Sequence, residues 1–231
     1  MEKICTVLWK PGELSDDAFR DGLLAQAPDL AKHGAMRLRI AVVDSQLAGA
    51  KARVGRMDPP KAAMVSFWLH EADARAPVEE RLAQSSSRLC SFLVVESEPI
   101  RNTDHVAPLG RRTPGFDLVT CIEPKAGLSY VDFIRHWHTE HRACAVETQS
   151  TFGYVRNEIV RALTPDAPSW AAIVEEHFPI EALTDPMVWY AARGSKERYE
   201  RNFRRMIDSC MAFLAMDRVE AHPMSEYVFE R

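Results

Sequence analysis

Several short stretches of the chain carry apolar side chains at nearly every position. Residues 4–9 are apolar except for Thr6, and residues 64–69 are apolar except for Ser66. A strand with one face in water alternates between apolar and polar residues, whereas a strand covered on both faces is apolar throughout. The pattern therefore predicts a sheet that is covered by helices on one face and by other strands on the second.

A strand followed by a helix occurs near the start of the chain and again near its middle. In each copy a turn with proline and glycine ends the strand, and a serine, Ser15 or Ser129, stands where it can cap the helix. The two segments align without a gap, with four identical pairs: Thr6 with Thr120, Leu14 with Leu128, Ser15 with Ser129, and Phe19 with Phe133. This match predicts an internal repeat.

The remaining elements follow the same order in both halves. In the first half we predict strands over residues 4–9, 37–44, 62–69 and 91–97, with helices from residue 16 and over 78–88. In the second half we predict strands from residue 118 and over 153–160, 171–178 and 225–229, with helices from residue 130 and over 195–215. Proline-containing loops are expected over 45–60 and 162–168.

The order strand, helix, strand, strand, helix, strand is typical of a ferredoxin-like unit. We therefore predict an α+β fold of two tandem ferredoxin-like (βαββαβ) repeats that pair as a pseudo-dimeric barrel within one chain. The first repeat spans residues 1–100 and the second spans 116–231. The segment 101–115 is rich in proline, glycine and arginine and is expected to be the linker.

The composition narrows the class of protein. The 231 residues are 46% hydrophobic, which excludes a disordered chain, and 29 basic against 33 acidic residues give a net charge of −4, which does not favour a nucleic-acid partner. Five widely spaced cysteines without a CxxC pair favour neither a disulfide framework nor structural zinc. The first apolar run is too short for a signal peptide or a membrane span, so we expect a cytoplasmic protein.

Three histidines lie close together in the helix predicted to begin after the second capping serine. At helical spacing Phe133, Trp137 and His141 share one face, and because the two aromatic residues belong in the core, His141 should face the sheet. His136 should point to solvent, and His138 should lie on the flank.

Two interpretations of His141 remain open. It is either a hydrogen-bonded core histidine or a general acid or base, because an imidazole in an apolar pocket can titrate near physiological pH. His138 and His141 could together ligate a metal ion, but neither H-E-x-x-H nor H-x-x-E-H occurs, so no metal is expected. No nucleotide-binding glycine motif occurs either, and a haem held by His141 alone has no further support in the sequence.

The predicted strand over 171–178 carries three ionisable residues in succession, Glu175, Glu176 and His177. Strand alternation puts Glu175 and His177 on one face and Glu176 on the other. A carboxylate and an imidazole on one covered face could form an acid/base pair, whereas at a sheet edge they would be solvated. In the neighbouring strand Tyr154 and Arg156 share a face.

The second half resembles an EthD domain over about residues 116–231. The resemblance rests on Gly127-Leu128-Ser129, Phe133, His136-Trp137, His141, Gly153-Tyr154-Val155-Arg156-Asn157 and Ile173-Val174-Glu175. The first half resembles the same fold as a degenerate copy, because Gly22, Leu23, Ala27 and Ser66 stand where the second half has His136, Trp137, His141 and Glu175.

The resemblance implies a dimeric α/β barrel with an apolar pocket between the sheet and the helices. It implies a cofactor-independent enzyme that performs acid/base chemistry on a small hydrophobic, aromatic or cyclic metabolite, as a lyase or isomerase of the decarboxylase, dehydratase or cyclase type. A cofactor-free monooxygenase and a non-catalytic carrier of a hydrophobic ligand are the alternatives. The internal pseudo-dimer could associate further into a homodimer.

Seven side chains of the second half are the candidates for this site. The expected catalytic residues are His141, which would move the proton, Glu175, which would orient or share it, and His177 and Tyr154, which would assist. The expected substrate-binding residues are Arg156, which could hold a carboxylate or an enolate, and Trp137 and His138.

Overall fold

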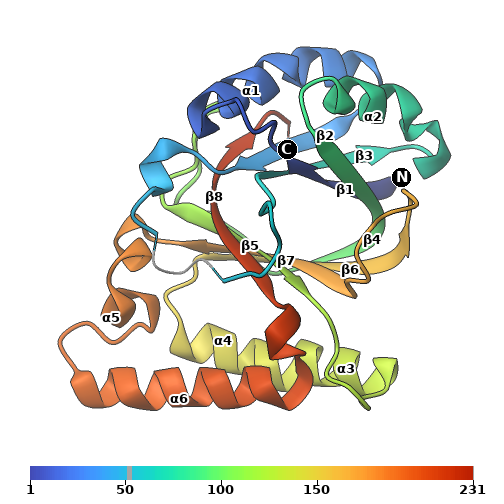
Figure 1. Cartoon of the computed structure of the whole chain (residues 1–231). Coiled ribbons are helices and arrows are strands. Elements are labelled where there is room, and N and C mark those ends of the chain that lie inside the picture. Colours follow the sequence, from blue (N-terminus) through green and yellow to red (C-terminus); the bar gives the residue numbers. More distant parts are fainter. Residues whose placement is uncertain (51–53, 231) are drawn as a thin grey trace.

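The fold is a closed antiparallel barrel whose strands come from both halves of the chain. The structure is a computed structural model, and it describes residues 1–50 and 54–230. Within those residues the strands are β1 (Glu2–Trp9), β2 (Met36–Val42), β3 (Ala63–Leu69), β4 (Arg88–Ile100), β5 (Phe116–Ile122), β6 (Gly153–Ala162), β7 (Ala172–Phe178) and β8 (Glu220–Val228). They close in the order β1-β3-β2-β8-β5-β7-β6-β4, and Figure 1 looks into the barrel.

Helices cover the outside of the barrel on two opposite sides. They are α1 (Asp16–Lys32), α2 (Ala76–Ala83), α3 (Tyr130–His136), α4 (Arg142–Thr148), α5 (Pro186–Trp189) and α6 (Lys196–Phe213), and a π-helical turn, Trp137–His141, joins α3 to α4. Figure 1 shows α1 and α2 on one side, with α3, α4 and α6 on the other.

The predicted serine caps are confirmed. The Ala18 N–H donates to Ser15 Oγ over 3.1 Å at the start of α1, and the Asp132 N–H donates to Ser129 Oγ over 3.1 Å at the start of α3. Each bond satisfies an N–H group that the first helical turn leaves without a partner. The same local chemistry therefore starts the first helix of both halves.

Apolar packing occurs on both faces of the strands, as the sequence predicts. On the outer face of the barrel in the first half, Phe19, Leu23 and Leu30 of α1 pack against β1 and β3. Inside the barrel, a second cluster joins strands of both halves and contains no residue of the α-helices; it includes Cys5, Val7, Trp9, Met64, Phe92, Val119, Cys121, Ile173 and Met224. The closed barrel explains why these strands are apolar at successive positions.

One end of the barrel interior is polar. Residues two positions apart in a strand share a face, so Lys3, Asp117 and Glu175 point into the barrel as their neighbours in the apolar cluster do. These neighbours are Cys5, Val119 and Ile173. All three polar side chains are buried. The interior is therefore an apolar core at one end and a network of buried charged groups at the other.

The two halves are joined through hydrogen-bonded strand pairs. β2 pairs with β8, and β4 pairs with β6, both antiparallel. In each half the elements follow the predicted order of strand, helix, strand, strand, helix, strand, with short extra helical segments between some of them. Both halves are thus needed to close the barrel.

Some element boundaries differ from those predicted. The last strand was predicted over 225–229 but begins at Glu220. Its first residues pair with β5 alone, and β2 pairs with Ser225–Val228, so Pro223 has a paired strand on one side only. β4 begins at Arg88, where helix 78–88 was expected to end, because it pairs with the whole of β1. The predicted loop over 45–60 includes residues 51–53, which lie outside the described residues.

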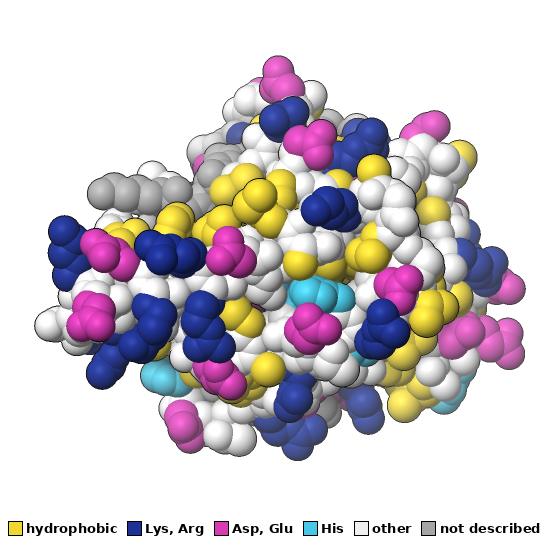
Figure 2. Space-filling view, turned by 90° about the horizontal axis from the view of Figure 1, so that it is seen from below, with side chains coloured by type: hydrophobic (Ala, Val, Ile, Leu, Met, Phe, Trp, Pro, Cys, Tyr) yellow, Lys and Arg dark blue, Asp and Glu magenta, His cyan; other side chains and the backbone are white. Residues whose placement is uncertain are grey.

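The outer surface of the helices in the second half is highly charged. The basic residues of α6 are exposed, namely Lys196, Arg198, Arg201, Arg204 and Arg205. Figure 2 shows the molecule from this side, with basic and acidic side chains interspersed over the surface. None of the helices in the described residues has the length and apolar character needed to cross a bilayer.

Candidate active site

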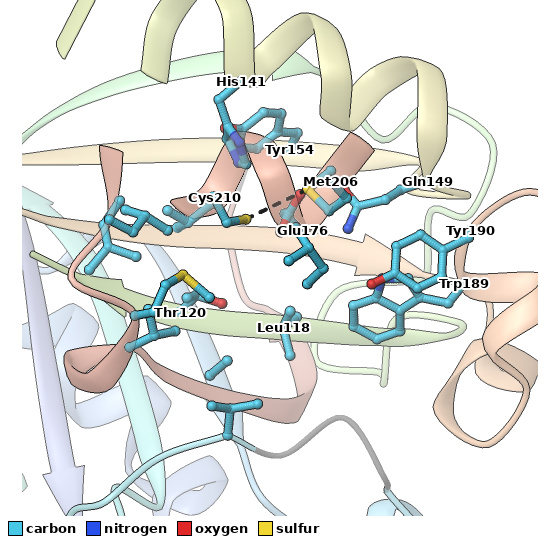
Figure 3. A pocket seen from close by; sticks show the side chains of 18 of the residues that line it. Leu118, Thr120, His141, Gln149, Tyr154, Glu176, Trp189, Tyr190, Met206 and Cys210 are labelled. Carbon is cyan, nitrogen blue, oxygen red and sulfur yellow. Dashed lines mark hydrogen bonds between the residues drawn. The ribbon is translucent and has the colours of Figure 1, made fainter. Parts of the chain in front are cut away.

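An apolar pocket of about 380 Å³ lies between the strands of the second half and the helices that cover them. Strands β5, β6 and β7 form one wall, the π-helical turn and α6 form the opposite wall, and α5 closes one side (Figure 3). Most of the lining is apolar, with Leu118, Ile122, Trp137, Val174, Met206, Phe213 and Trp189 among its residues. A small number of polar groups in such a surrounding is typical of a small-molecule site.

Glu176 places a carboxyl group in this apolar surrounding. Its side chain comes from β7 and faces the pocket beside Val174, with Met206 and Cys210 of α6 opposite (Figure 3). Burial raises the pKa of Glu176 to about 7, and the charge of His177 on the other face of the strand only partly opposes that shift. A carboxyl group with such a pKa can take up and release a proton near neutral pH.

His141 brings a neutral imidazole to the same pocket. Its Nδ1 lies 3.0 Å from Ser209 Oγ of α6, and its ring centroid lies 4.7 Å from that of Phe213. Burial, reinforced by the charge of His136, lowers the pKa of His141 to about 4. At neutral pH the ring is therefore uncharged and can donate one hydrogen bond and accept another.

The π-helical turn determines how His141 is presented. The turn spans Trp137–His141 and inserts a wider turn between two α-helical segments, so Trp137 is buried against the sheet while His141 reaches the pocket. Turns of this kind are rare and occur often at functional sites. The prediction that Trp137 and His141 lie on the side of the helix toward the sheet is thus confirmed, although the turn that contains them is π-helical and not α-helical.

Tyr154 supplies a hydroxyl group from β6. Trp137 Nε1 donates to the Tyr154 hydroxyl oxygen over 3.0 Å, so the tyrosine proton remains free to donate elsewhere. Burial raises the pKa of Tyr154, with a further contribution from Glu176. The hydroxyl group therefore stays protonated and is a hydrogen-bond donor at the pocket wall.

The pocket has no cationic side chain among the described residues that line it. Two further uncharged polar groups, Thr120 Oγ1 and Gln149 Oε1, are buried without a hydrogen-bond partner. A largely apolar lining with a few uncharged polar groups suits a mainly hydrophobic ligand that carries one or two polar groups.

The structure separates Glu175 and His177 from His141, contrary to the prediction that they act together. Both point into the barrel, where Asn157 Nδ2 donates to Glu175 Oε1 over 2.8 Å and His177 Nε2 lies 3.2 Å from Glu226 Oε2. The predicted alternation along β7 is correct, but the face was assigned wrongly. The side chains of Glu175 and His177 belong to the charged network at this end of the barrel interior, on the face of β7 away from the helices.

Arg156 and His138 are near the pocket but do not line it. Arg156 Nε donates to Ser97 Oγ over 3.0 Å, and its guanidinium carbon lies 5.8 Å from the Trp137 ring centroid. The ring centroid of His138 lies 5.1 Å from that of Trp137. The structure therefore places Trp137, His141 and Tyr154 together and leaves the predicted anion-binding arginine outside the cavity.

His136 is half-buried, although the sequence predicted exposure. Its ring packs against Phe213 with a centroid distance of 5.1 Å, and Nδ1 lies 3.1 Å from Glu140 Oε2. The end of α6 covers this side of α3, which the periodicity of α3 alone could not reveal.

The corresponding region of the first half is filled by core side chains. Leu23 and Ala27, which align with Trp137 and His141, are buried in the cluster that joins α1 to β1 and β3. Of the described residues that line the candidate pocket, Val54 belongs to the first half and the others belong to the second.

Sequence reasoning missed Glu176, Thr120 and Gln149. The signal for Glu176 was present, because alternation put it on the face opposite Glu175, and its register partner on β6 is Tyr154. Tyr154 packs with Phe133 and Trp137, which marks that face as the one covered by helices. Among the described residues no group of three or more His, Cys, Asp or Glu is arranged to hold a metal ion.

Comparison with solved structures identifies the fold as a dimeric α/β barrel. The chain is similar to an anthrone oxidase-like protein, with a TM-score of 0.56 and 9% identity, over 100% of this chain and 94% of that one. It is also similar to a candidate monooxygenase from Lactobacillus acidophilus NCFM, with a TM-score of 0.50 and 8% identity, over 99% and 96% of the two chains. No protein-family model matches the chain, and no curated protein matches its sequence.

Proposed function

We propose that this chain is a cofactor-independent oxygenase that acts on an uncharged, flat, hydrophobic aromatic ketone. The observation that carries the proposal is the carboxyl group of Glu176, whose pKa of about 7 makes it a base in a pocket lined by apolar and aromatic side chains. The names of the two fold relatives, an anthrone oxidase-like protein and a candidate monooxygenase, both refer to oxidation, and the first refers to an aromatic ketone.

Glu176 would act as the general base. In its ionised form it would remove a proton from a CH₂ group that is conjugated with the substrate carbonyl group through the aromatic rings, and the resulting negative charge would spread onto the carbonyl oxygen. The imidazole of His141 or the hydroxyl group of Tyr154 would donate a hydrogen bond to that oxygen. An electron-rich anion of this kind can react with O₂, so that a CH₂ group and O₂ become a C=O group and water.

A reaction without oxygen is the second candidate. The same proton transfer, returned to a different atom of the substrate, would give an isomerase, a cyclase or a dehydratase. Acid and base groups alone, Glu176, His141 and Tyr154, are enough for such a step. A decarboxylase has less support, because no lysine or arginine lines the described pocket to hold a substrate carboxylate.

A further part of the proposal concerns the origin of the fold. We propose that the two halves are copies of one ferredoxin-like unit of the EthD type and that the first copy lost the pocket. The matching strand orders β2-β3-β1-β4 and β6-β7-β5-β8 support this, as do the two serine caps and the replacement of His141 by Ala27.

Oxygen uptake with anthrone as the probe tests the function. We expect the protein to consume O₂ above the uncatalysed rate at pH 7.5 and to form anthraquinone. Glu176→Gln keeps the size of the side chain but removes the base, so the catalysed rate should fall by about 10² to 10⁴-fold. Glu147→Gln is the control, because Glu147 forms an exposed ion pair with Arg205.

The outcomes separate the candidate functions. Conversion of anthrone without O₂ uptake would favour the isomerase or cyclase reaction. Binding of anthrone without conversion would favour a carrier. An equal rate for the wild-type protein and Glu176→Gln would contradict the assignment of the base.

A further inference from the structure

A second cavity of about 380 Å³ opens at the polar end of the barrel. It lies on the opposite face of β6 and β7 from the apolar pocket, so Val155 and His177 line this cavity while Tyr154 and Glu176 line the other. Residues of the segment between β4 and β5, among them Arg101 and Val106, form part of its rim. The proposed oxygenase reaction does not use this cavity.

Most of the charged groups at this end of the barrel are already paired with one another. Lys3 Nζ lies 2.5 Å from Glu96 Oε2 and 3.6 Å from Glu175 Oε1. Arg101 Nε lies 3.1 Å from Glu98 Oε2, and His177 Nε2 lies 3.2 Å from Glu226 Oε2. Each of these contacts brings a basic group next to an acidic one around the cavity.

Two arginines of β2 keep hydrogen-bond donors that their neighbours do not use. Arg37 and Arg39 both line the cavity, and within the part of the chain that the structure describes neither guanidinium group makes a hydrogen bond. Arg39 Nη1 is 3.8 Å from Glu226 Oε1, too long for a hydrogen bond, and the Arg37 guanidinium lies over the Trp68 ring at 5.5 Å. Each guanidinium carries five N–H donors.

A buried polar atom at the same place also has no hydrogen bond. His177 lines the cavity and is 4% exposed, and its Nδ1 has no hydrogen-bond partner among the described residues, while its Nε2 faces Glu226. A buried polar group without a partner is costly, and in a cavity of this size a ligand can provide the partner.

We propose that this end of the barrel binds a small, singly charged carboxylate with an apolar body. The carboxylate lies between Arg37 and Arg39, because a guanidinium group matches the two oxygens of a carboxylate. The apolar body packs on Trp68 and Val106, which line the same cavity. A doubly charged phosphate is disfavoured, because Glu96, Glu98 and Glu226 surround the two arginines.

Titration calorimetry of the whole protein with three probes tests the chemical class of the ligand. Benzoate carries the carboxylate and an apolar ring, benzamide keeps the shape without the charge, and inorganic phosphate carries the charge without the ring. We expect benzoate to bind at least tenfold more tightly than either of the others. Equal binding of benzoate and benzamide, tighter binding of phosphate, or no binding of benzoate would overturn the proposal.

Variants of β2 test the location. Arg39→Gln and Arg37→Gln should each weaken benzoate binding at least tenfold, and Arg39→Lys, which keeps the charge but loses the planar pair of donors, should have an intermediate effect. Arg161→Gln makes the same charge change at an exposed position on β6, where Arg161 pairs with exposed Asp73, and should leave the affinity unchanged. Circular dichroism before titration confirms that each variant is folded. Unchanged affinity in both glutamine variants would show that benzoate binds elsewhere, for instance in the apolar pocket, and would refute the site.

Discussion

Two adjacent glutamates on β7 show how strongly the surroundings set the chemistry of a residue. Glu175 accepts a hydrogen bond from Asn157 and lies 3.6 Å from Lys3, whereas Glu176 faces an apolar pocket. The side chain of Glu175 is bonded to its partners inside the barrel, whereas burial raises the pKa of Glu176 to about 7. Only Glu176 therefore has the properties of a general base that works near neutral pH.

The rate of the proposed reaction should depend on pH through Glu176. Because the base must be ionised, we expect kcat/KM to rise with pH and to level off above the pKa of Glu176, about 7. Neutral His141, whose pKa is about 4, should add no change between pH 5.5 and 9. Steady-state kinetics of anthrone oxidation over this range provides the check, and a rate that falls with rising pH would rule out Glu176 as the base.

The raised pKa of Glu176 predicts that the protein loses stability as the pH rises. Because folding raises the pKa of Glu176 from 4.5 to about 7, its favourable contribution is complete below pH 4.5 and is lost as the pH rises through 7. Glu176→Gln has no such loss. The melting temperature of the variant relative to the wild-type protein should therefore increase from pH 5 to pH 8, and a constant difference would contradict the shifted pKa.

The glycines of β6 and α1 differ in the space that a larger side chain would find. A Cβ atom on Gly153 at the start of β6 would lie 2.9 Å from His177 Nδ1, inside a strand pair that has no room to separate. A Cβ atom on Gly22 in α1 would meet nothing within 4 Å. The first position is fixed by the packing inside the barrel, and the second only by helix propensity.

Alanine at these two glycines should have opposite effects. Gly153→Ala should lower the free energy of unfolding by about 1–3 kcal/mol through overpacking, and Gly22→Ala should raise it by about 0.5–1 kcal/mol, because alanine favours the helix. Urea unfolding of both variants measures the difference. A neutral Gly153→Ala would mean that His177 can move aside without cost.

At the scale of the whole molecule, buried charges connect the two halves. Lys3 of β1 donates to Glu96 of β4 and to Asn157 of β6, and it lies near Glu175 of β7. Burial lowers the pKa of Lys3, but Glu175 and other neighbours outweigh that effect and raise it. The ammonium group is therefore charged and holds strands of both halves together inside the barrel.

Removal of this charge should destabilise the entire barrel. Lys3→Met leaves the carboxylates of Glu96 and Glu175 without their cation, and we expect a loss of about 3–5 kcal/mol in the free energy of unfolding. Lys32→Met, at an exposed position near the end of α1, is the matched control and should change stability by less than about 1 kcal/mol. If both variants unfold at the same urea concentration, the network does not hold the halves together.

The sequence by itself determined the parts of this protein that depend on neighbours along the chain. Ser15 and Ser129 act as helix caps, the strands are covered on both faces, and the order of elements is the same in both halves, because hydrogen bonds within a helical turn and the periodicity of a strand are local properties. The contrast between Ala27 and His141 likewise indicated which half would keep polar side chains for a site.

Only the tertiary structure decided which side of each strand meets which partner. Alternation separated Glu175 from Glu176, but a period of two cannot tell the face beneath the helices from the face inside the barrel. That choice depended on the closure of β2 onto β8 and of β4 onto β6, between residues far apart in sequence. The same closure brought Lys3, Arg39, His177 and Glu226 together, because a shared interior is a property of the whole barrel and of no single segment.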